Sequence, residues 1–238
     1  MFSIIVPTFN EEKHLAGTLR ALKKLRVRHE IIVADSGSKD RTVSIAREYA
    51  DKVVSYTDAP RNAARGRNLG ASVATGSFLV FIDADVSIAD IDKFFTVASA
   101  AFLLNDKLVA IAPRVEILPH VRTRTDDWNC RACNTLMWAL NNFLHLGFGS
   151  GDLQFIRASA FDAVGGYKIA LNIGEDVELY KRLQMVGEVR YRNDLVVMHP
   201  GRRPHKIGWL RLWRDCIINV IAVRLFCRTW DADWRVIR

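Results

Sequence analysis

The chain has 238 residues, of which 50% are hydrophobic and 25% are charged, a composition that excludes a disordered, fibrous or repeat-built protein. Its net charge of +8 is uneven, because residues 1–180 hold 21 basic and 21 acidic side chains whereas residues 181–238 hold 13 and 5. A neutral body with a basic C-terminal segment argues against nucleic acid as a partner and indicates a local contact with anions.

Short apolar runs alternate with amphipathic segments in the first part of the chain. The pattern predicts strands at residues 4–6, 31–34, 53–56 and 78–82, and helices at 12–26, 40–49 and 62–74. Near-continuous apolar strands separated by helices are typical of a parallel sheet that is covered on both faces. We therefore predict an α/β fold with a mostly parallel central sheet flanked by helices.

The second part of the chain is less regular. It predicts strands at 108–118, 154–156 and 189–198, helices at 128–146, 175–185 and 209–226, and a glycine-rich loop at 147–151. No segment has the length or composition of a linker between domains.

Targeting and spanning signals are not evident in the sequence. Residues 1–7 lack the charged start of a signal peptide, and the longest apolar runs, 94–104 and 216–223, are shorter than the roughly 20 residues of a bilayer span. Cys130 and Cys133 have the spacing of a metal pair but no completing ligands nearby, so with Cys216 and Cys227 they indicate reduced thiols. We predict a cytoplasmic protein, with peripheral contact at the inner face of the cell membrane left open.

Polar residues follow three of the predicted strands, at 7–11, 35–38 and 83–85. Because ligands of parallel α/β sheets bind beyond the carboxyl ends of the strands, these residues are expected to share one crevice. Asp83 and Asp85 suit a divalent cation with diphosphate oxygens, although Asp-x-Asp also occurs in solvated turns. Asp35 suits the N–H edge of a nucleobase, or else the start of the next helix, a role open equally to Ser38 or Asp40.

Four segments in this order resemble the family 2 glycosyltransferases: IVPTFNEE (5–12), VADSGSKD (33–40), ARGRNLGA (64–71) and FIDAD (81–85). The likeness continues through FIR (155–157), VGGY (164–167) and GEDVEL (174–179), and covers about residues 2–200. It implies the GT-A fold, a UDP- or GDP-linked sugar donor, a divalent ion (Mn²⁺ or Mg²⁺) and inversion at the anomeric carbon.

The resemblance also implies a set of site residues. Those expected to bind the nucleotide-sugar are Pro7, Thr8, Asn10, Glu11, Asp35, Ser36, Gly37, Arg65, Asn68, Asp83, Ala84, Arg202 and Arg203. Asp85, Asp83 and His199 are the expected metal ligands, with a structural role for His199 as the alternative. Asp176 is the expected general base and Glu175 the second candidate, unless both acids only favour a helix N-terminus electrostatically.

The resemblance implies the addition of a single sugar, because the Gln-x-x-Arg-Trp signature of processive members is absent from the sequence. The acceptor is expected to be a carbohydrate or a lipid-linked hydroxyl in cell-envelope glycan, polysaccharide or glycolipid synthesis. A nucleotide-sugar-binding or nucleotidyltransferase-like protein of related fold is the alternative, disfavoured because both Asp85 and Asp176 are present and no Gly-rich, Lys-containing loop follows the first strand.

The chain is expected to divide into a catalytic domain, 1–200, and a basic amphipathic helical tail, 201–238. Within the catalytic domain, about 1–105 would bind the nucleotide-sugar and about 106–200 the acceptor. In the tail, apolar residues recur at helical spacing beside arginines. This stripe favours packing against the catalytic domain or a second subunit in a homodimer, with contact of 207–228 with an anionic membrane as the alternative.

Overall fold

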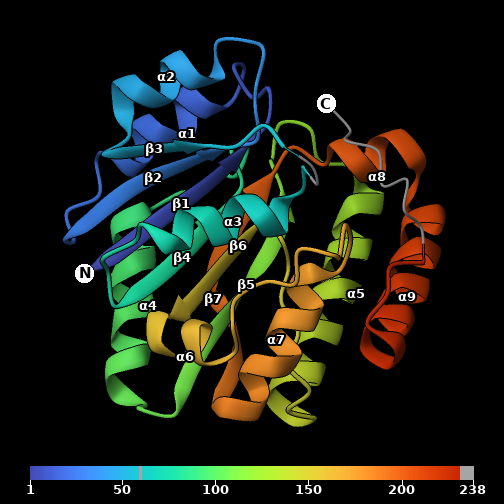
Figure 1. Ribbon diagram of the computed structural model, residues 1–238. Helices are drawn as coiled ribbons and strands as arrows, with labels where there is room; N and C mark the ends of the chain where they lie inside the picture. The colour runs from blue at the N-terminus through green and yellow to red at the C-terminus, as the bar shows by residue number, and fades with distance from the viewer. Residues whose placement is uncertain (59–60, 231–238) are drawn as a thin grey trace.

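The computed structural model describes residues 1–58 and 61–230, within which seven strands form one sheet with helices on both faces (Figure 1). The first elements are β1 (Phe2–Thr8), α1 (Leu15–Leu22), β2 (His29–Asp35), α2 (Thr42–Tyr49), β3 (Lys52–Ser55), α3 (Ala63–Ser72), β4 (Phe78–Ile82) and α4 (Ile91–Leu104). They are followed by β5 (Leu108–Ile117), α5 (Arg124–Trp138), the π-helical turn η1 (Ala139–Phe143), β6 (Leu153–Arg157), α6 (Ala158–Ala163), α7 (Glu175–Val186), β7 (Glu188–His199), α8 (Arg202–Ile207) and α9 (Trp209–Phe226).

The strands follow the order β3-β2-β1-β4-β6-β5-β7 across the sheet. The pairs β1–β2, β1–β4, β2–β3 and β5–β7 are parallel, whereas β6 runs antiparallel to both of its neighbours, β4 and β5. The prediction of an α/β fold with a mostly parallel sheet is therefore confirmed. The parallel strands deliver their carboxyl ends to one edge of the sheet.

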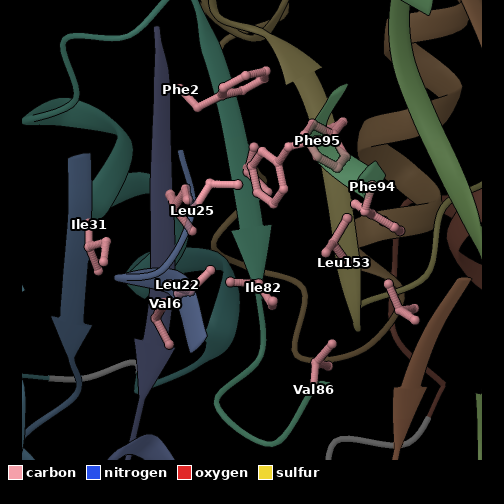
Figure 2. Close-up of a cluster of buried hydrophobic side chains, with 14 of the residues drawn as sticks. Phe2, Val6, Leu22, Leu25, Ile31, Ile82, Val86, Phe94, Phe95 and Leu153 are labelled. Atoms are coloured by element: carbon pink, nitrogen blue, oxygen red, sulfur yellow. The ribbon is translucent and has the colours of Figure 1, made fainter. Parts of the chain in front are cut away.

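Alternate residues of the strands enter two separate hydrophobic cores. On β1, Ile4 and Val6 pack with α1 and α4, whereas Ile5 faces the opposite side with α3 and α7. Figure 2 shows the first core, where Phe94 and Phe95 of α4 lie against side chains of β1, β4 and β6. Because both faces are buried, the strands read as continuous apolar runs.

Three helices, α4, α6 and α8, are missing from the prediction. α6 and α8 have six residues each, too few for a helical period to be recognised. α4 begins where the Asp90 side chain accepts a hydrogen bond from the N–H of Lys93, and it carries exposed leucines besides its buried phenylalanines. Its apolar residues therefore do not form a narrow stripe.

Two predicted helices have different bounds in the structure. The helix expected at 12–26 occupies only Leu15–Leu22, because the segment before it forms a loop that bonds to residues 38–42. The helix expected at 128–146 starts earlier, at Arg124, where Thr123 and Asp126 form a reciprocal capping box. It ends in η1, which widens its last turn.

The C-terminal helix is present and docks on the body of the protein. Figure 1 shows α9 beside α5 at one side of the molecule. The Asp126 carboxylate accepts a hydrogen bond from Nε1 of Trp209 at 2.7 Å and lies 2.9 Å from Nε2 of His205, and Trp213 bonds to Asn129 at 2.7 Å. In the described part of the chain, no helix has both the length and the hydropathy needed to cross a bilayer. Residues 231–238 of the predicted tail lie outside the described residues.

Candidate active site

Two aspartates at the end of β4 define the centre of the candidate site. The backbone N–H of Asp83 bonds to the carbonyl of Asp152 at 3.0 Å, which ties this end of β4 to the loop before β6. Asp85 lies two residues further and accepts a hydrogen bond from Arg202 of α8 at 2.5 Å. Burial, with the charges of Asp152 and Asp85, raises the pKa of Asp83 to about 7 against the opposing effect of Arg67.

Arg67 of α3 joins the carboxylates of this site. Its side chain is only 2% exposed, and it donates to Asp83 at 3.1 Å and to Glu175 at 2.8 Å. A third bond, to the carbonyl of Gly151, measures 2.9 Å. Because a buried guanidinium is stable only beside opposite charge, Arg67 fixes the end of β4 and the start of α7 relative to each other.

The acidic pair of the GEDVEL segment lies at the N-terminus of α7. Gly174 precedes the helix in the left-handed conformation, at φ 72°, and Glu175 and Asp176 form its first turn. Burial and the adjacent Glu175 raise the pKa of Asp176 to about 7, while Arg67 opposes the shift. A carboxylate whose pKa lies near neutrality is suited to accept a proton at neutral pH.

Gly151 lies between these groups. A Cβ atom at Gly151 would stand 3.5 Å from Nη2 of Arg67 and 3.9 Å from Oδ2 of Asp176. The predicted base, the loop before β6 and the Asp83–Asp85 segment therefore lie close together.

Asp35 ends β2, two strands away from β4 along the same edge of the sheet. It is buried, and its carboxylate accepts four hydrogen bonds from the chain: Thr8 and Ser38 hydroxyls on Oδ1, and the N–H groups of Gly37 and Ser38 on Oδ2. These donors occupy the acceptor sites of a carboxylate, so base recognition by Asp35 requires one of them to be displaced. Asp35 does not cap α2: the N-cap residue is Arg41, and the N–H of Thr42 at the start of the helix bonds to Asp40.

The loop after β1 is bonded to the loop after β2. Asn10 has φ 53°, its N–H donates to Ser38 at 2.7 Å, and its side-chain oxygen accepts from Lys39 at 2.7 Å. The N–H of Glu11 donates to Thr42, and the Glu11 carboxylate lies 3.7 Å from Arg202. The predicted nucleoside-binding residues at 8–11 and 35–38 therefore form one connected wall.

Arg65 lies beside this wall. Its guanidinium stacks over the Tyr56 ring at 4.7 Å and pairs with Asp58 at 2.5 Å. Ser36 donates to the Tyr56 hydroxyl, and α3 passes so close to β1 that a Cβ atom at Gly66 would lie 3.6 Å from Cβ of Pro7. Of the two arginines in ARGRNLGA, the structure therefore places Arg67, which was not predicted, among the carboxylates.

Asn68 and Ala84 have structural contacts in this arrangement. The Asn68 amide bonds in both directions to the backbone of Tyr167, at 2.8 and 2.9 Å, which holds the VGGY turn on α3. The carbonyl of the buried Ala84 accepts from Thr18 of α1 at 2.6 Å. The predicted contacts of both residues with the donor stay predictions.

The predicted three-ligand metal set is not assembled. Among the described residues, no group of three His, Cys, Asp or Glu side chains is arranged to hold a metal ion. His199 ends β7, where its Nδ1 accepts the N–H of Gly201 at 3.2 Å. Asp83 and Asp85 provide carboxylates alone, which fits Mg²⁺ or Mn²⁺ in nucleotide sites, since these ions take one or two carboxylates plus phosphate oxygens.

Arg202 and Arg203 begin α8, after Gly201 in the left-handed conformation. Arg202 contacts Asp85, whereas Arg203 is partly buried toward α9, and this burial lowers its pKa. The structure thus brings Arg202 to the Asp85 carboxylate and directs Arg203 toward the C-terminal helix.

One signal in the sequence could have found Arg67. It occupies the buried face of α3 with Ala64 and Gly70, at helical spacing, just before a strand that ends in acids.

The chain matches a known family along most of its sheet. A family model described as glycosyl transferase family 2 matches residues 3–165. The chain is 43% identical over 91 residues to a 4,4'-diaponeurosporenoate glycosyltransferase of Staphylococcus haemolyticus, covering 36% of this chain and 24% of that protein. It is 28% identical over 215 residues to an O-antigen chain rhamnosyltransferase of Salmonella anatum, covering 83% of this chain and 65% of that one. The chain therefore spans less than two thirds of the length of these relatives.

Solved structures share the fold at low sequence identity. A mannosyltransferase from Pyrobaculum calidifontis in complex with GDP-Man and Mn²⁺ matches with a TM-score of 0.70 and 21% identity, over 93% of this chain and 61% of that chain. Glucosyl-3-phosphoglycerate synthase from Mycobacterium tuberculosis, in complex with Mn²⁺, UDP-glucose and phosphoglyceric acid, matches with a TM-score of 0.64 and 20% identity, over 98% and 81% of the two chains.

Proposed function

The chain belongs to glycosyl transferase family 2 and has the GT-A fold, and from this premise we propose that it moves one sugar from a nucleotide-diphospho-sugar to an acceptor hydroxyl with inversion. One observation carries the proposal. The buried Arg67 binds Asp83, on the expected donor side, and Glu175, on the expected acceptor side. These ion pairs hold the end of β4 close to the α7 acids, which supports a single displacement at one carbon.

Asp176 is the proposed general base. Direct displacement with inversion needs a base that takes the proton of the acceptor hydroxyl as the new bond forms. The raised pKa of Asp176 and its place beside Gly151 support this role. Glu175 is the proposed partner that holds Arg67 and keeps a second negative charge next to the base.

The donor is proposed to lie between the wall at 8–11 and 35–38 and the aspartates after β4. Tyr56 and Arg65 flank this wall, and the backbone N–H groups at 36–38 approach the same end of β2. GDP-Man and UDP-glucose are the nucleotide-sugars in the structures of the two matching proteins. We propose a UDP- or GDP-linked sugar as donor.

A divalent ion, Mn²⁺ or Mg²⁺, is proposed to bind Asp85 and Asp83 together with the donor diphosphate. When bound, the ion would neutralise the charge that develops on the departing nucleotide diphosphate. Arg202 already lies at 2.5 Å from Asp85 and supplies positive charge on the same side of the crevice.

The acceptor is proposed to be a carbohydrate or lipid-linked hydroxyl of a cell-envelope glycan, polysaccharide or glycolipid. The names of the matched relatives, which include an O-antigen chain rhamnosyltransferase, favour this class. A cytoplasmic location and a division into catalytic domain and tail at residue 200 belong to the same proposal. The alternative, a nucleotide-sugar-binding protein without transfer activity, is separated from it by the experiment below.

The proposal is tested by nucleotide binding and by turnover. Uridine, guanosine, thymidine and cytidine diphosphates are added with and without Mn²⁺, and the melting temperature is followed. A ligand at one hundred times its dissociation constant stabilises the protein by about 2.7 kcal/mol. We expect a metal-dependent shift with one or two bases, and its absence with all four would overturn the proposal.

Asp176→Asn separates transfer from binding. Because the amide cannot accept the acceptor proton, we expect the nucleotide shift to remain and sugar transfer to fall by about a hundredfold or more. Asp106→Asn, at an exposed site between α4 and β5, is the matched control and should transfer sugar normally. Full activity in Asp176→Asn would assign the base elsewhere, and binding without transfer in the natural chain would favour the alternative.

A further inference from the structure

α9 exposes an apolar stripe to solvent. Leu210 is 90% exposed, Ile217 52% and Leu225 71%, and with Ile221 they recur at helical spacing along one side of the helix. The opposite side, with Asn219, Ala222 and Val223, is the buried one. An amphipathic helix ordinarily buries its apolar stripe, so this face of α9 has no partner in the described part of the chain.

Two exposed apolar side chains lie on α5, the helix that Trp209 and Trp213 of α9 contact. Trp128 is 77% exposed and Leu136 is 46% exposed on this helix. The two helices run parallel, because the bonds Asp126–Trp209 and Asn129–Trp213 advance along both chains in the same direction. Figure 1 shows them side by side.

Helical phase places both sets of exposed residues on the side of this helix pair that faces away from the body. On α9, Leu210 and Ile217 lie about half a turn from the buried Asn219, and on α5, Trp128 lies about half a turn from the buried Asp126 and Cys130. One residue turns a helix by about 100°. Because both helices direct their buried residues at the body of the protein, these exposed residues share the outer side. We call this surface the α5–α9 face and define it by Trp128, Leu136, Leu210, Ile217, Ile221 and Leu225.

The α5–α9 face holds six of the 18 large hydrophobic side chains that are exposed in the described residues. A concentration of this kind marks an interaction surface, whereas scattered single residues need no explanation.

The surface has a basic margin. Arg211 and Arg214 are exposed on α9, and Arg124 and Arg131 are exposed on α5. Asp215 contacts both of the α9 arginines and offsets one of the two charges. A two-fold dimer through this face would bring like charges together, because such an interface pairs a patch with itself. Anionic lipid headgroups complement the same charges.

We propose that the α5–α9 face binds the surface of an anionic lipid bilayer, with its apolar side chains in the acyl boundary and its arginines at the headgroups. Tryptophan and arginine beside aliphatic residues are the composition of helices that lie in a membrane interface. The surface combines α5 with α9, so it is wider than the segment 207–228 that the sequence singled out.

The α5–α9 face lies near the start of α7, which carries the proposed base. A Cβ atom placed at Gly174, two residues before Asp176, would lie 3.1 Å from Val223 on the buried side of α9. A bilayer on the outer side of α9 would thus lie one helix away from the proposed base. This implies an acceptor carried by a lipid, a conclusion that rests on the proposed sugar transfer, whereas the membrane contact itself does not.

Vesicle co-sedimentation tests the proposal, with phosphatidylcholine vesicles compared to vesicles containing about 30% phosphatidylglycerol. We expect binding to the anionic vesicles that weakens in 1 M salt, where the screening length falls to about 3 Å. Ile217→Ser with Ile221→Ser should reduce binding at least tenfold. Arg211→Gln with Arg214→Gln should also reduce it at least tenfold, since each arginine contributes about fivefold near an anionic surface.

Leu103→Ser with Leu104→Ser provides the matched control. These leucines are as exposed as those of α9 but end α4, outside the α5–α9 face, and their loss should leave vesicle binding unchanged. Absence of binding to anionic vesicles would overturn the proposal, as would equal binding by the Ile217/Ile221 variant. A dimer in ultracentrifugation that this variant dissolves, without vesicle binding, would assign the face to a second copy instead.

The nucleotide-dependent melting shift is measured in the same variants. Their positions lie outside the proposed donor site, so the shift should persist in all of them. Vesicle binding without any nucleotide shift would contradict the proposed function and leave the membrane contact standing. A normal nucleotide shift without vesicle binding would have the opposite meaning.

Discussion

Arg67 is the side chain whose replacement should most disturb the candidate site. It neutralises Asp83 and Glu175 at once while buried, so its removal leaves carboxylates without a partner. We expect Arg67→Gln to lower the free energy of unfolding by about 3–5 kcal/mol. Urea denaturation at pH 7 measures this, and an unchanged midpoint would show that the network contributes nothing to stability.

Arg67→Lys separates charge from geometry. A lysine keeps the positive charge. Its single ammonium does not reproduce the planar guanidinium fork, whose two terminal nitrogens bond to Asp83, Glu175 and Gly151. The variant should therefore fold and still show the nucleotide shift, while sugar transfer falls more than tenfold. Equal turnover of the variant and the natural chain would mean that the position of the α7 acids does not depend on the fork.

The pH dependence of transfer follows from the raised pKa of Asp176. A general base works only when deprotonated, and burial with the Glu175 charge raises the pKa of this group to about 7. The rate should thus be constant at high pH and fall about tenfold per unit below pH 7. The profile of kcat against pH measures this fall. Arg67 favours the charged form of Asp176, so Arg67→Gln should raise the pKa of Asp176 and shift the fall in kcat to higher pH. A flat profile from pH 5 to 8 would contradict the assignment.

At the residue scale, the sequence predicted the carboxylates better than their partners. Asp83, Asp85, Glu175 and Asp176 follow from strand ends and motifs, and Arg67 links the two segments that carry them. Arg67 did not follow, because which of two arginines in a helix faces inward depends on how that helix packs. The four bonds that fill Asp35 also depend on the exact course of the loop after β2.

Glu30 shows how a single group joins several elements. Its carboxylate accepts from Ser3 on β1 at 2.6 Å, pairs with Lys52 on β3 at 2.8 Å and accepts the N–H of Thr75, before β4, at 2.6 Å. Burial opposes its ionisation, but these hydrogen bonds are stronger and lower the pKa of Glu30 to about 2. Three strands and a loop are thereby tied to one negative charge.

Glu30→Gln should therefore destabilise the protein in a pH-dependent way. Because the folded pKa lies below the ordinary value near 4.5, the stabilisation is full above pH 4.5 and is lost as the pH falls toward 2. The shift corresponds to about 3 kcal/mol at pH 7, since one pKa unit is about 1.4 kcal/mol. Urea midpoints at pH 7 and pH 3 measure the difference, which should shrink in acid.

Asp194→Asn is the control for Glu30→Gln. Asp194 pairs with Arg192 on an exposed part of β7, and such a pair contributes at most about 1 kcal/mol. An equal cost at Glu30 and Asp194 would show that burial of the Glu30 network has no special effect.

At the element scale, apolar runs in the sequence predicted where the strands lie, whereas the direction of β6 and the orientation of α9 depend on packing. The runs at 4–6, 31–34 and 78–82 are buried on both sides and were predictable from composition alone. The reversal of β6 was not, since an apolar run has no direction until its neighbours are known. α9 shows the same limit: an amphipathic helix was predicted, and its Trp209 and Trp213 do contact α5, but the exposure of Leu210, Ile217, Ile221 and Leu225 depends on Asn219 and Ala222 facing the body.

At the scale of the whole molecule, the basic C-terminal segment contacts the neutral body through an ion pair between Arg202 and Asp85. Arg202 belongs to the basic segment after residue 180, and Asp85 to the neutral body, yet they meet at 2.5 Å above the proposed donor site. Glu11, at the end of β1, lies 3.7 Å from the same guanidinium. One arginine of the basic segment, Arg202, therefore contacts the candidate site, while Arg211 and Arg214 remain on the outer surface.

Arg202→Gln should change metal and nucleotide binding in opposite directions. Without the guanidinium the Asp85 carboxylate is free of its competing cation, so Mn²⁺ alone should bind several-fold more tightly; a tenfold change is about 1.4 kcal/mol. The nucleotide diphosphate with Mn²⁺ should bind more weakly, because an anion loses one of its positive partners. Titration calorimetry with Mn²⁺, and then with the nucleoside diphosphate that raised the melting temperature, measures both affinities.

Arg192→Gln, whose exposed ion pair with Asp194 lies on β7, is the control and should change neither affinity. If Arg202→Gln weakens Mn²⁺ binding as well, the guanidinium shapes the Asp85 loop instead of competing for its charge, and the C-terminal segment is then required to form the donor site.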